Sequence, residues 1–433
     1  MQSWDYDVAI VGGGPGGSTA AAFARKHNLT VLVLEKERFP RFHIGESLLP
    51  MGNALLRETG AWPKLEAAGF IHKYGAAFFT ANGRAATEIQ FNQSLVPGLD
   101  YTFQVERAKF DALLLDHARD LGAEVRFETT VRAIEAADGI HHVRIESAAG
   151  MQTVTARWVL DASGRETLFN LEQKRALDPS PFPKRVAIYN HFRGAARAAG
   201  RAAGHTVAVR LDDGWFWLIP LDDERTSVGL VTTVEAMRAA ALRPEDFFAR
   251  AVAGSSKLRE LLGGAEPLLP FRVTSDYSYF RRQLAGERII LVGDAAGFFD
   301  PIFSSGVYMS MSSAKMAVEL VVRAHAADRG LTPAERRRYT AAVKHSAGIF
   351  QKLIAVFYDN SSFAVFMCPE VRWKIRRAIT SIVAGHARFT WGLWWRFQMF
   401  LLICWLQQRR LGVVPALDFG EPAMDSEPSP ANS

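Results

Sequence analysis

Near the N-terminus a short apolar run leads directly into closely spaced glycines, and this segment constrains the fold more than any other. Residues 5–37 read DYDVAIVGGGPGGSTAAAFARKHNLTVLVLEKE. The apolar run 8–11 predicts a buried strand, the alanine-rich stretch after the glycines predicts a helix, and the run 31–34 predicts a second buried strand. A strand, a glycine turn, a helix and a second strand form the opening unit of a doubly wound α/β sheet.

The glycines and the acid that ends the second strand indicate a dinucleotide site. Gly12, Gly14 and Gly17 have the spacing G-x-G-x-x-G. Glycines there let the backbone approach a pyrophosphate, and the helix N-terminus offers it unpaired N–H groups. Glu35 is placed to accept a hydrogen bond from a ribose hydroxyl, and we assign its neighbour Lys36 to the same site. The alternative, a glycine turn that serves only helix–strand packing, leaves Glu35 unexplained.

The composition is that of a globular enzyme made of two or three packed domains. Of the 433 residues, 48% are hydrophobic and 22% are charged. Two cysteines cannot form a disulfide framework, and no signal peptide is visible, so we expect a cytoplasmic protein. The net charge of +6 permits attraction to an acidic partner but does not indicate nucleic-acid binding. We expect no nucleic acid as a partner and assign no metal site.

Three segments farther along the chain extend the cofactor site. Gly293 and Asp294 follow an apolar run in ERIILVGDAAGFFDP, Asp161 and Gly164 lie in VLDASGRET, and Arg107 lies in FQVERAKFD. These segments resemble the Gly-Asp, D-x-x-G and arginine motifs of the FAD-dependent aromatic-hydroxylase superfamily. The resemblance implies FAD, with Asp294 on its ribityl chain and Arg107 near its phosphates. Taken singly, each segment also fits an ordinary strand-to-helix turn.

Two tryptophans one residue apart indicate which family of this superfamily the chain resembles. In GWFWLIP, residues 214–220, the alternation of a strand puts Trp215 and Trp217 on one face. Taken alone, the pair favours a hydrophobic core, because large aromatic residues dominate core burial. The stretch resembles the G-W-x-W-x-I-P motif of flavin-dependent halogenases, and that resemblance implies that the indoles lie beside the flavin and keep the substrate away from it.

A lysine in HKYGAAF, residues 72–78, is the candidate for the halogenating step. Lys73 resembles the active-site lysine of the halogenases, and we assign it a catalytic role with the two tryptophans and Ser305. The resemblance implies that halide attacks a flavin C4a-hydroperoxide and that Lys73 binds or traps the hypohalous acid. Partial burial would lower the pKa of the amine and favour either role. The alternative is a surface lysine, the usual place for this residue type.

The segment FDPIFSSGV, residues 299–307, resembles the turn that binds halide in the family. The resemblance places Pro301 against the isoalloxazine and assigns the halide to Ser304, Ser305 and Gly306, with Gly306 also touching the cofactor. Backbone N–H groups and hydroxyls at a helix N-terminus suit a chloride or bromide ion. Helix capping by serine explains the same residues without a ligand.

The resemblance also covers RFPRFHIGESLLP, residues 38–50, where His43, Gly45, Glu46 and Ser47 match a stretch that lies over the flavin. We count Glu46 and Ser47 among the cofactor-binding residues. The resemblance runs with interruptions from residue 5 to about residue 360 and is greatest to the halogenases of pyrroles and phenols, many of which act on a ring tethered to a carrier protein. Free-tryptophan halogenases have a glutamate where this chain has Phe303, which argues against free tryptophan as the substrate.

The C-terminal region resembles the family least. Residues 389–406, FTWGLWWRFQMFLLICWL, are short for a membrane-spanning helix and carry Arg396 near the middle. We expect a helix that is buried or covers the substrate entrance, with a helix on a membrane surface as the alternative. An acidic carrier protein, a membrane surface and plain solvation each explain the basic residues Arg372, Lys374, Arg376 and Arg377. The tail 419–433 is predicted to be disordered.

These observations predict an α/β protein with an FAD-binding, Rossmann-like fold of the aromatic-hydroxylase or glutathione-reductase type, an inserted mixed β-sheet that forms a substrate layer, and a helical C-terminal region. The expected boundaries are 1–72, 106–178 and 276–330 for the FAD-binding parts, 73–105 and 179–275 for the substrate layer, 331–418 for the helical region and 419–433 for the tail.

The expected reaction is halogenation of a phenol-like or pyrrole-like ring by reduced FAD, dioxygen and halide, with a separate flavin reductase supplying the reduced flavin. The ring is either a free small molecule or is borne by an acyl or peptidyl carrier protein. One alternative is an FAD-dependent reductase or monooxygenase of a lipid, polyprenyl or polyene substrate, and another is a non-catalytic flavoprotein.

Overall fold

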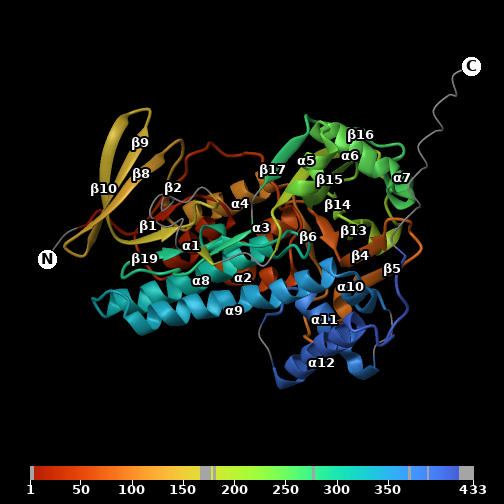
Figure 1. Ribbon diagram of the computed structural model, residues 1–433. Coiled ribbons are helices and arrows are strands. Elements are labelled where there is room, and N and C mark those ends of the chain that lie inside the picture. The colour runs from red at the N-terminus through yellow and green to blue at the C-terminus, as the bar shows by residue number, and fades with distance from the viewer. Residues whose placement is uncertain are drawn as a thin grey trace, which may run out of the picture.

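The computed structural model describes residues 4–165, 177–178, 182–275, 278–368, 372–387 and 390–418. The predicted disordered tail, 419–433, lies outside the described residues. Figure 1 shows a first sheet near the N-terminus, a second sheet at the other end of the molecule, and two long helices, α8 and α9, that pack against each other below the first sheet.

The first sheet is built on the glycine-rich segment. In chain order its strands are β1 (Tyr6–Val11), β2 (Val31–Leu34), β7 (Glu124–Arg126), β8 (Thr130–Ala137), β9 (Ile140–Ser147), β10 (Gly150–Asp161) and β19 (Ile289–Leu291). Strands β7, β2, β1, β10 and β19 pair in parallel in that order, and β9 and β8 extend the sheet in antiparallel pairing from β10. Both faces of β1 and β2 are buried, which explains their continuous apolar sequences. The expected strand–helix–strand unit is confirmed, with α1 (Pro15–Lys26) as its helix.

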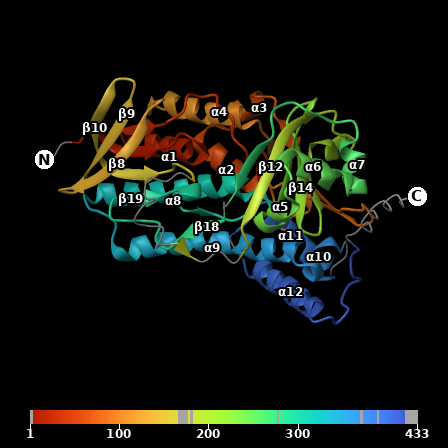
Figure 2. The same ribbon diagram turned by 45° about the horizontal axis from the view of Figure 1, so that its top comes forward.

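The second sheet confirms the expected mixed substrate layer. Its strands are antiparallel except that β13 and β4 pair in parallel. In chain order they are β4 (Gly75–Thr80), β5 (Ala86–Gln90), β12 (Arg185–Arg193), β13 (Thr206–Arg210), β14 (Gly214–Pro220), β15 (Arg225–Thr233), β16 (Glu266–Pro267) and β17 (Arg272–Ser275). Figure 2 shows β12 and β14 in this sheet, in which β15 lies between them and pairs with both.

The two faces of this sheet bury different residues of β14. Phe216 and Leu218 pack against the helices α6 (Pro244–Ala253) and α7 (Ser256–Leu262), which follow the short helix α5 (Val234–Ala240). Trp215 and Trp217 belong to the main core, which is shared with the first sheet and the long helices. The strand alternation predicted from the sequence is therefore confirmed, and both indoles lie on the inner face.

Shorter elements connect the two sheets. They are α2 (Pro50–Thr59), α3 (Trp62–Ala67), α4 (Arg107–Asp120), the paired strands β3 (Ile71–Lys73) and β6 (Thr102–Gln104), and the small sheet of β11 (Leu177–Asp178), β18 (Tyr279–Arg281) and β20 (Gly297–Phe298). Lys73 ends β3, so it lies at the junction of the two sheets.

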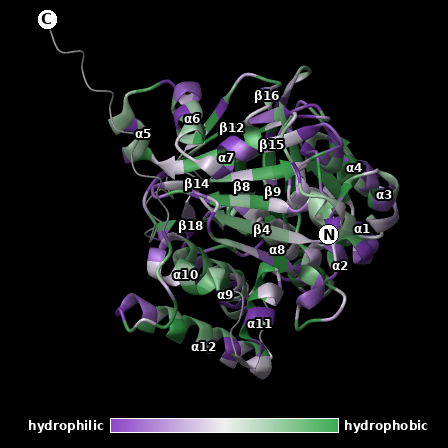
Figure 3. Cartoon of the chain, turned by 90° about the vertical axis from the view of Figure 1, so that its right-hand side faces the viewer, coloured by the Kyte–Doolittle hydropathy of each residue, from purple (hydrophilic) through white to green (hydrophobic). Residues whose placement is uncertain are grey.

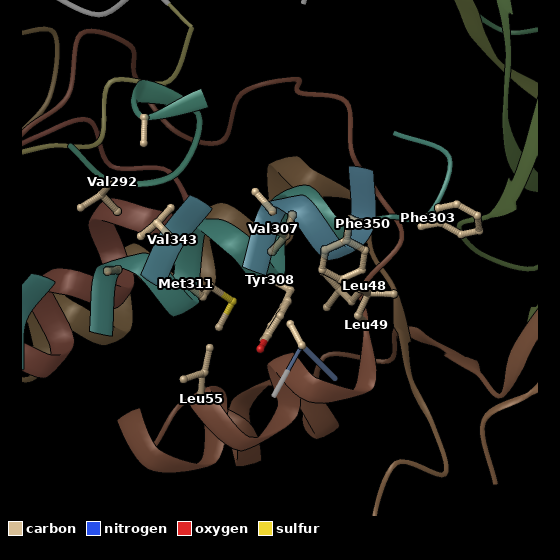
Figure 4. Close-up of a cluster of buried hydrophobic side chains, with 14 of the residues drawn as sticks. Leu48, Leu49, Leu55, Val292, Phe303, Val307, Tyr308, Met311, Val343 and Phe350 are labelled. Atoms are coloured by element: carbon tan, nitrogen blue, oxygen red, sulfur yellow. The ribbon is translucent and has the colours of Figure 1, made fainter. Parts of the chain in front are cut away.

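Helices complete the C-terminal region: α8 (Ser305–Ala326), α9 (Pro333–Tyr358), α10 (Asn360–Met367), α11 (Ile375–Val383) and α12 (Trp391–Gln408). Figure 4 shows part of the core between α8 and its neighbours, where Tyr308 and Met311 of α8 lie near Leu55 of α2, and Phe350 of α9 lies near Leu48. Among the described residues, no helix is both long enough and apolar enough to span a membrane.

Candidate functional site

Two glycines of the first turn are required by close backbone contacts. Gly12 has φ +96°, and a Cβ there would lie 2.5 Å from the carbonyl oxygen of Ala162. A Cβ on Gly17 would lie 1.9 Å from the carbonyl oxygen of Gly12. Any side chain at either position would force the turn, α1 and β10 apart, so these glycines serve the fold whether or not a ligand is bound.

Gly14, in contrast, is not required by protein packing. It occupies the N-cap of α1, and the heavy atom nearest to a Cβ at this position would be Nη2 of Arg41, at 3.6 Å. The missing side chain therefore leaves space in front of the unpaired N–H groups of the helix, which fits the pyrophosphate of a dinucleotide. Arg41 brings a positive charge to this space, and its guanidinium also pairs with Glu37 at 2.9 Å.

Glu35 fits the ribose end of such a ligand. Its carboxylate is buried and accepts hydrogen bonds from the backbone N–H of Gly13 (2.7 Å) and of Glu37 (2.9 Å). These bonds fix the carboxylate beside the glycine turn and leave lone pairs on both oxygens for a hydroxyl donor. The neighbouring Lys36 is exposed on the turn that follows β2.

Arg107 holds the loop that carries Glu46 and Ser47. Its guanidinium binds Asp111 through two hydrogen bonds, of 2.7 and 2.8 Å, and donates to the carbonyl oxygen of Ile44 at 2.7 Å. The structure therefore places Arg107 in a buried ion pair. Nη1 of Arg107 also donates to the carbonyl oxygen of Gly45 at 3.4 Å, and the positive charge of the guanidinium acts on Asp294.

Asp294 is the acid at the end of β19 that sequence analysis assigned to the ribityl chain. Desolvation raises the pKa of its carboxyl to about 6, although the charges of Arg107 and Arg165 oppose that shift. Asp294 lines a cavity with Gly306 and Ser305 at the start of α8. Asp161, also assigned to the cofactor, is fully buried and accepts hydrogen bonds from Ser163, next to Gly164 at φ +74°.

The wall formed by the two indoles is held by its neighbours. Trp215 and Trp217 are 2% and 5% exposed, and their ring centroids lie 5.9 Å apart. Trp217 donates to Ser227 Oγ at 3.2 Å and lies over Gly229 of β15. A Cβ on Gly229 would lie 2.1 Å from the Trp217 ring, so only glycine admits the indole there.

A hydrogen-bond chain joins the wall to the start of α8. Trp215 Nε1 donates to the hydroxyl of Tyr358 at 2.8 Å, and that hydroxyl donates to Oδ2 of Asp300 at 2.8 Å. The guanidinium carbon of Arg185 lies 3.4 Å from the centre of the Tyr358 ring. Burial raises the pKa of Asp300 to about 6. Asp300 directly precedes Pro301, so this chain fixes the indole wall relative to the segment assigned to the flavin and the halide.

Lys73 is a buried amine. It is 2% exposed, and Nζ donates to Ser47 Oγ at 2.7 Å and to the carbonyl oxygen of Leu48 at 3.1 Å. Burial lowers its pKa to about 7. Ser47 Oγ lies 2.9 Å from Oγ1 of Thr206, the first residue of β13, the strand next to β14. The surface location left open by the sequence is wrong, and Lys73 is linked to the sheet that carries the indoles.

Glu46 forms a buried pair that sequence analysis did not identify. Oε1 of Glu46 lies 2.7 Å from Nε2 of His191, on β12. The other carboxylate oxygen, Oε2, is buried and has no hydrogen-bond partner in the protein. A buried acceptor of this kind is expected to face a ligand or ordered water. This agrees with the position over the cofactor that the resemblance gives to Glu46. His43, on the same loop, is exposed.

The segment assigned to halide has an unusual backbone. Ser304 is the N-cap of α8 with φ 54°, and its side chain makes no capping hydrogen bond. Plain capping by that serine is therefore not observed. Ser305 and Gly306 form the first turn of the helix beside the cavity that Asp294 lines. Phe303 lies in an aromatic cluster, with ring centroids 6.3 Å from Phe78, 6.2 Å from Phe357 and 6.1 Å from Phe366.

Sequence analysis did not identify several residues that contact the predicted site residues and fix their positions. These are Arg41, His191, Thr206, Gly229, Tyr358 and Asp300. Gly229 carries a usable signal, because a glycine inside the strand pattern RTSVGLVTT indicates a close approach by a neighbouring group. His191, Thr206, Tyr358 and Asp300 lie far along the chain from the residues they contact, and no local pattern connects them.

Comparison with known proteins identifies the family to which this chain is similar. A family model described as tryptophan halogenase matches residues 7–85 and 59–363. The 1H-pyrrole-2-carbonyl peptidyl-carrier-protein chlorinase of Pseudomonas fluorescens is 33% identical over 419 residues, covering 90% of this chain and 92% of that protein. A flavoprotein/dehydrogenase from Cytophaga hutchinsonii superposes with a TM-score of 0.85 at 28% identity, covering 94% and 99% of the two chains. The flavin-dependent brominase Bmp2 superposes with a TM-score of 0.82 at 26% identity, also covering 94% and 99%.

Proposed function

Because this chain belongs to the tryptophan halogenase family, we propose that it halogenates an electron-rich aromatic ring, a pyrrole or a phenol rather than free tryptophan. The chain is a flavin-dependent halogenase, an oxidoreductase that uses FAD in its reduced form with a halide as co-substrate. The reductase, monooxygenase and non-catalytic alternatives are not favoured. We propose the class of ring, the halide used and the roles of the individual residues.

The observation that carries the proposal is the buried Lys73. A lysine that is 2% exposed, with a pKa lowered to about 7, holds comparable amounts of ammonium and free amine at neutral pH. As an ammonium, Nζ donates a hydrogen bond to the oxygen of a hypohalous acid. As a free amine, it takes the halogen from that acid and water leaves. Both routes retain a diffusible oxidant at one atom, which a fully exposed lysine would not do.

The cofactor fits the cradle in front of α1. Bound FAD in its reduced form activates dioxygen, which oxidises the halide. Gly12, Gly14 and Gly17 admit its pyrophosphate, while Glu35 receives its ribose. We assign Glu46, Arg107, Asp161 and Asp294 to its remaining polar groups, and Lys36, Ser47, Gly164, Pro301 and Gly306 to the same surface. Ser304, Ser305 and Gly306 hold the halide through the first turn of α8.

The indole wall separates oxidation from substitution. Trp215 and Trp217 fill the inner face of β14 and leave no room for an organic substrate against them. Lys73 is linked through Ser47 to Thr206 at the start of β13, the strand next to β14. An oxidant that passes the indoles is then held at Nζ, and the ring is halogenated there.

The aromatic cluster around Phe303 supports a pyrrole or phenol as the substrate. Phe78, Phe357 and Phe366 offer no acceptor to an indole N–H or to the ammonium of an amino acid. A ring activated by its own nitrogen or hydroxyl needs no carboxylate from the protein. Similarity to the pyrrole carrier-protein chlorinase supports a ring tethered to an acyl or peptidyl carrier protein, with the free ring as the alternative.

We also propose a separate flavin reductase as the source of reduced FAD, because the sequence shows a single glycine-rich dinucleotide fingerprint. A cytoplasmic location is supported by the cysteine content, because two cysteines in 433 residues cannot form a disulfide framework.

The test is mass spectrometry of reactions fed reduced FAD, chloride or bromide, and free and carrier-bound pyrroles and phenols. The wild-type protein should give a halogenated ring. Lys73→Ala should lower product formation by about two orders of magnitude or more, as expected for loss of a residue that acts only in the chemical step, with FAD binding unchanged. Lys352→Ala, at an exposed lysine of α9, is the matched control. Halogenation by Lys73→Ala at the wild-type rate would exclude Lys73 from the reaction.

A further inference from the structure

Most of the exposed apolar side chains of this protein lie in one place. Of the eleven exposed large hydrophobic residues in the described part of the chain, seven fall between residues 373 and 413. Four of the seven are tryptophans: Trp373, Trp391, Trp394 and Trp405, which are 60, 73, 49 and 46% exposed. Isolated exposed apolar residues need no explanation, but a cluster of indoles does.

α12 presents these residues along one line. Helical spacing places Trp391, Trp394, Trp395, Gln398, Leu402, Trp405 and Arg409 on one side of the helix, and we call this set the outer stripe. Figures 1 and 3 show α12 at the outer edge of the molecule. The opposite side is buried in the protein through Leu393, Phe397, Phe400 and Cys404. Because this inner side packs on α10 and α11, the helix lies along the protein surface.

The segment that carries the outer stripe has an excess of positive charge, and the acidic residue Asp359 contacts α12 by accepting a hydrogen bond from Gln408 at 3.1 Å. The sequence has no aspartate or glutamate between Glu370 and Asp418. Lys374, Arg377, Arg409 and Arg410 are exposed.

Arginines also pack on the indoles themselves. The guanidinium carbon of Arg409 lies 4.3 Å from the Trp405 ring centre, and that of Arg396 lies 4.3 Å from the Trp395 ring centre. Arginine beside tryptophan at a surface is typical of the boundary between water and lipid.

A strained turn adds a further indole to this surface. Trp373 and Lys374 both have left-handed backbones, with φ 63° and 59°. Nε of Arg396 donates to the carbonyl oxygen of Trp373 at 2.8 Å and so ties the turn to α12. Two consecutive non-glycine residues with left-handed backbones cost conformational free energy, and this turn leaves the Trp373 indole exposed to solvent.

We propose that the outer stripe, with Trp373 and the surrounding arginines and lysine, docks this enzyme on the surface of an anionic lipid bilayer. The stripe lies on a helix at the outer edge of the molecule, and a fluid lipid interface adapts to the side chains that enter it, whereas a protein partner needs a complementary surface. The excess of positive charge in residues 371–417, which contain no aspartate or glutamate, matches an anionic headgroup layer. The inner side of α12 stays in the protein, so contact is limited to the lipid surface. This inference does not depend on the substrate proposed above.

The test is flotation of the full-length protein with FAD bound, using vesicles of phosphatidylcholine alone or with 30% phosphatidylglycerol. The wild-type protein should float with the anionic vesicles and less with the neutral ones. Trp391→Ser/Trp405→Ser should weaken binding about tenfold or more, because two exposed indoles no longer enter the interface. Met151→Ser/Leu269→Ser changes two exposed apolar residues elsewhere and is the matched control. Flavin absorbance reports that each variant is folded.

A charge-reversal variant separates the electrostatic contribution. Arg409→Glu/Arg410→Glu should weaken binding to anionic vesicles at least tenfold and change binding to neutral vesicles little. The proposal is overturned if the wild-type protein does not float with anionic vesicles, or if the tryptophan variant floats as the wild type does. It is also overturned if an acidic acyl carrier protein binds through these residues while the vesicles do not.

Discussion

Lys73 should destabilise the protein that it serves, and replacing it with methionine should raise the free energy of unfolding. The side chain is 2% exposed, and its pKa is lowered by burial from 10.5 to about 7. Methionine fills a similar volume without a charge. Lys73→Met should therefore be more stable than the wild type at neutral pH and inactive in halogenation, as expected where stability and activity oppose each other.

The magnitude follows from the two pKa values. A lysine that titrates near 10.5 in the unfolded chain and near 7 in the folded protein lowers the free energy of unfolding by about 4 kcal/mol at pH 7. The hydrogen bonds from Nζ to Ser47 and Leu48 stabilise the folded protein by about 2 kcal/mol and offset part of this cost. Lys73→Met should thus gain roughly 2 kcal/mol at pH 7.

The sign of the pH dependence is fixed by the same values. Between pH 7 and 10.5 the unfolded chain binds more protons than the folded protein, so the wild type becomes more stable as the pH rises. At pH 9 the cost of Lys73 falls to about 2 kcal/mol, and the advantage of the variant should disappear.

The assay is urea denaturation of both proteins at pH 7, 8 and 9 and at one FAD concentration, with Lys352→Met as the exposed control. An advantage of Lys73→Met that stays constant with pH would show that Lys73 is not a buried titrating amine. A variant less stable than the wild type at pH 7 would show that the hydrogen bonds outweigh the burial of the amine.

Two further predictions concern glycines. Gly14→Val should fold and lose FAD, because Arg41 alone lies within 4 Å of the new carbon and the side chain occupies the space in front of α1; a purified variant that is still yellow would contradict the assignment of the cradle. Gly229→Ala should displace the Trp217 indole, because the new carbon would lie 2.1 Å from the ring, and should lower the stability by about 1–3 kcal/mol. The displaced indole should also let free hypohalous acid escape. Thermal denaturation measures the first effect and a scavenger assay the second, and a variant identical to the wild type in both would refute the reasoning.

The local parts of this fold were predictable from the sequence. The strand, turn and helix around Gly12 are encoded within 30 residues by glycine chemistry and apolar runs, and the structure has them as β1, α1 and β2. The two faces of β14 follow from the alternation of a strand, which puts Trp215 and Trp217 on one side.

The parts that depend on strand register and burial were not predictable. Gly229 lies under Trp217 because β14 and β15 pair in one register, and a sequence does not state that register. Lys73 is buried because the loop at Ser47 and Leu48 covers it, although lysine is usually exposed. α12 is apolar on nearly every side, so its sequence predicts a helix but does not indicate which side faces the protein.

The aromatic cluster around Phe303 also limits how this enzyme can evolve. Free-tryptophan halogenases have a glutamate at that position, and Phe303 is 3% exposed among Phe78, Phe357 and Phe366. A single change to glutamate would bury an unpaired carboxylate between aromatic rings, at a cost of several kcal/mol, which is a large part of the stability of an ordinary domain. A glutamate at this position therefore requires an earlier substitution of Phe366, on α10, that opens a polar or solvated space beside it. A change to glutamate at Phe303 alone should therefore lower the free energy of unfolding by several kcal/mol.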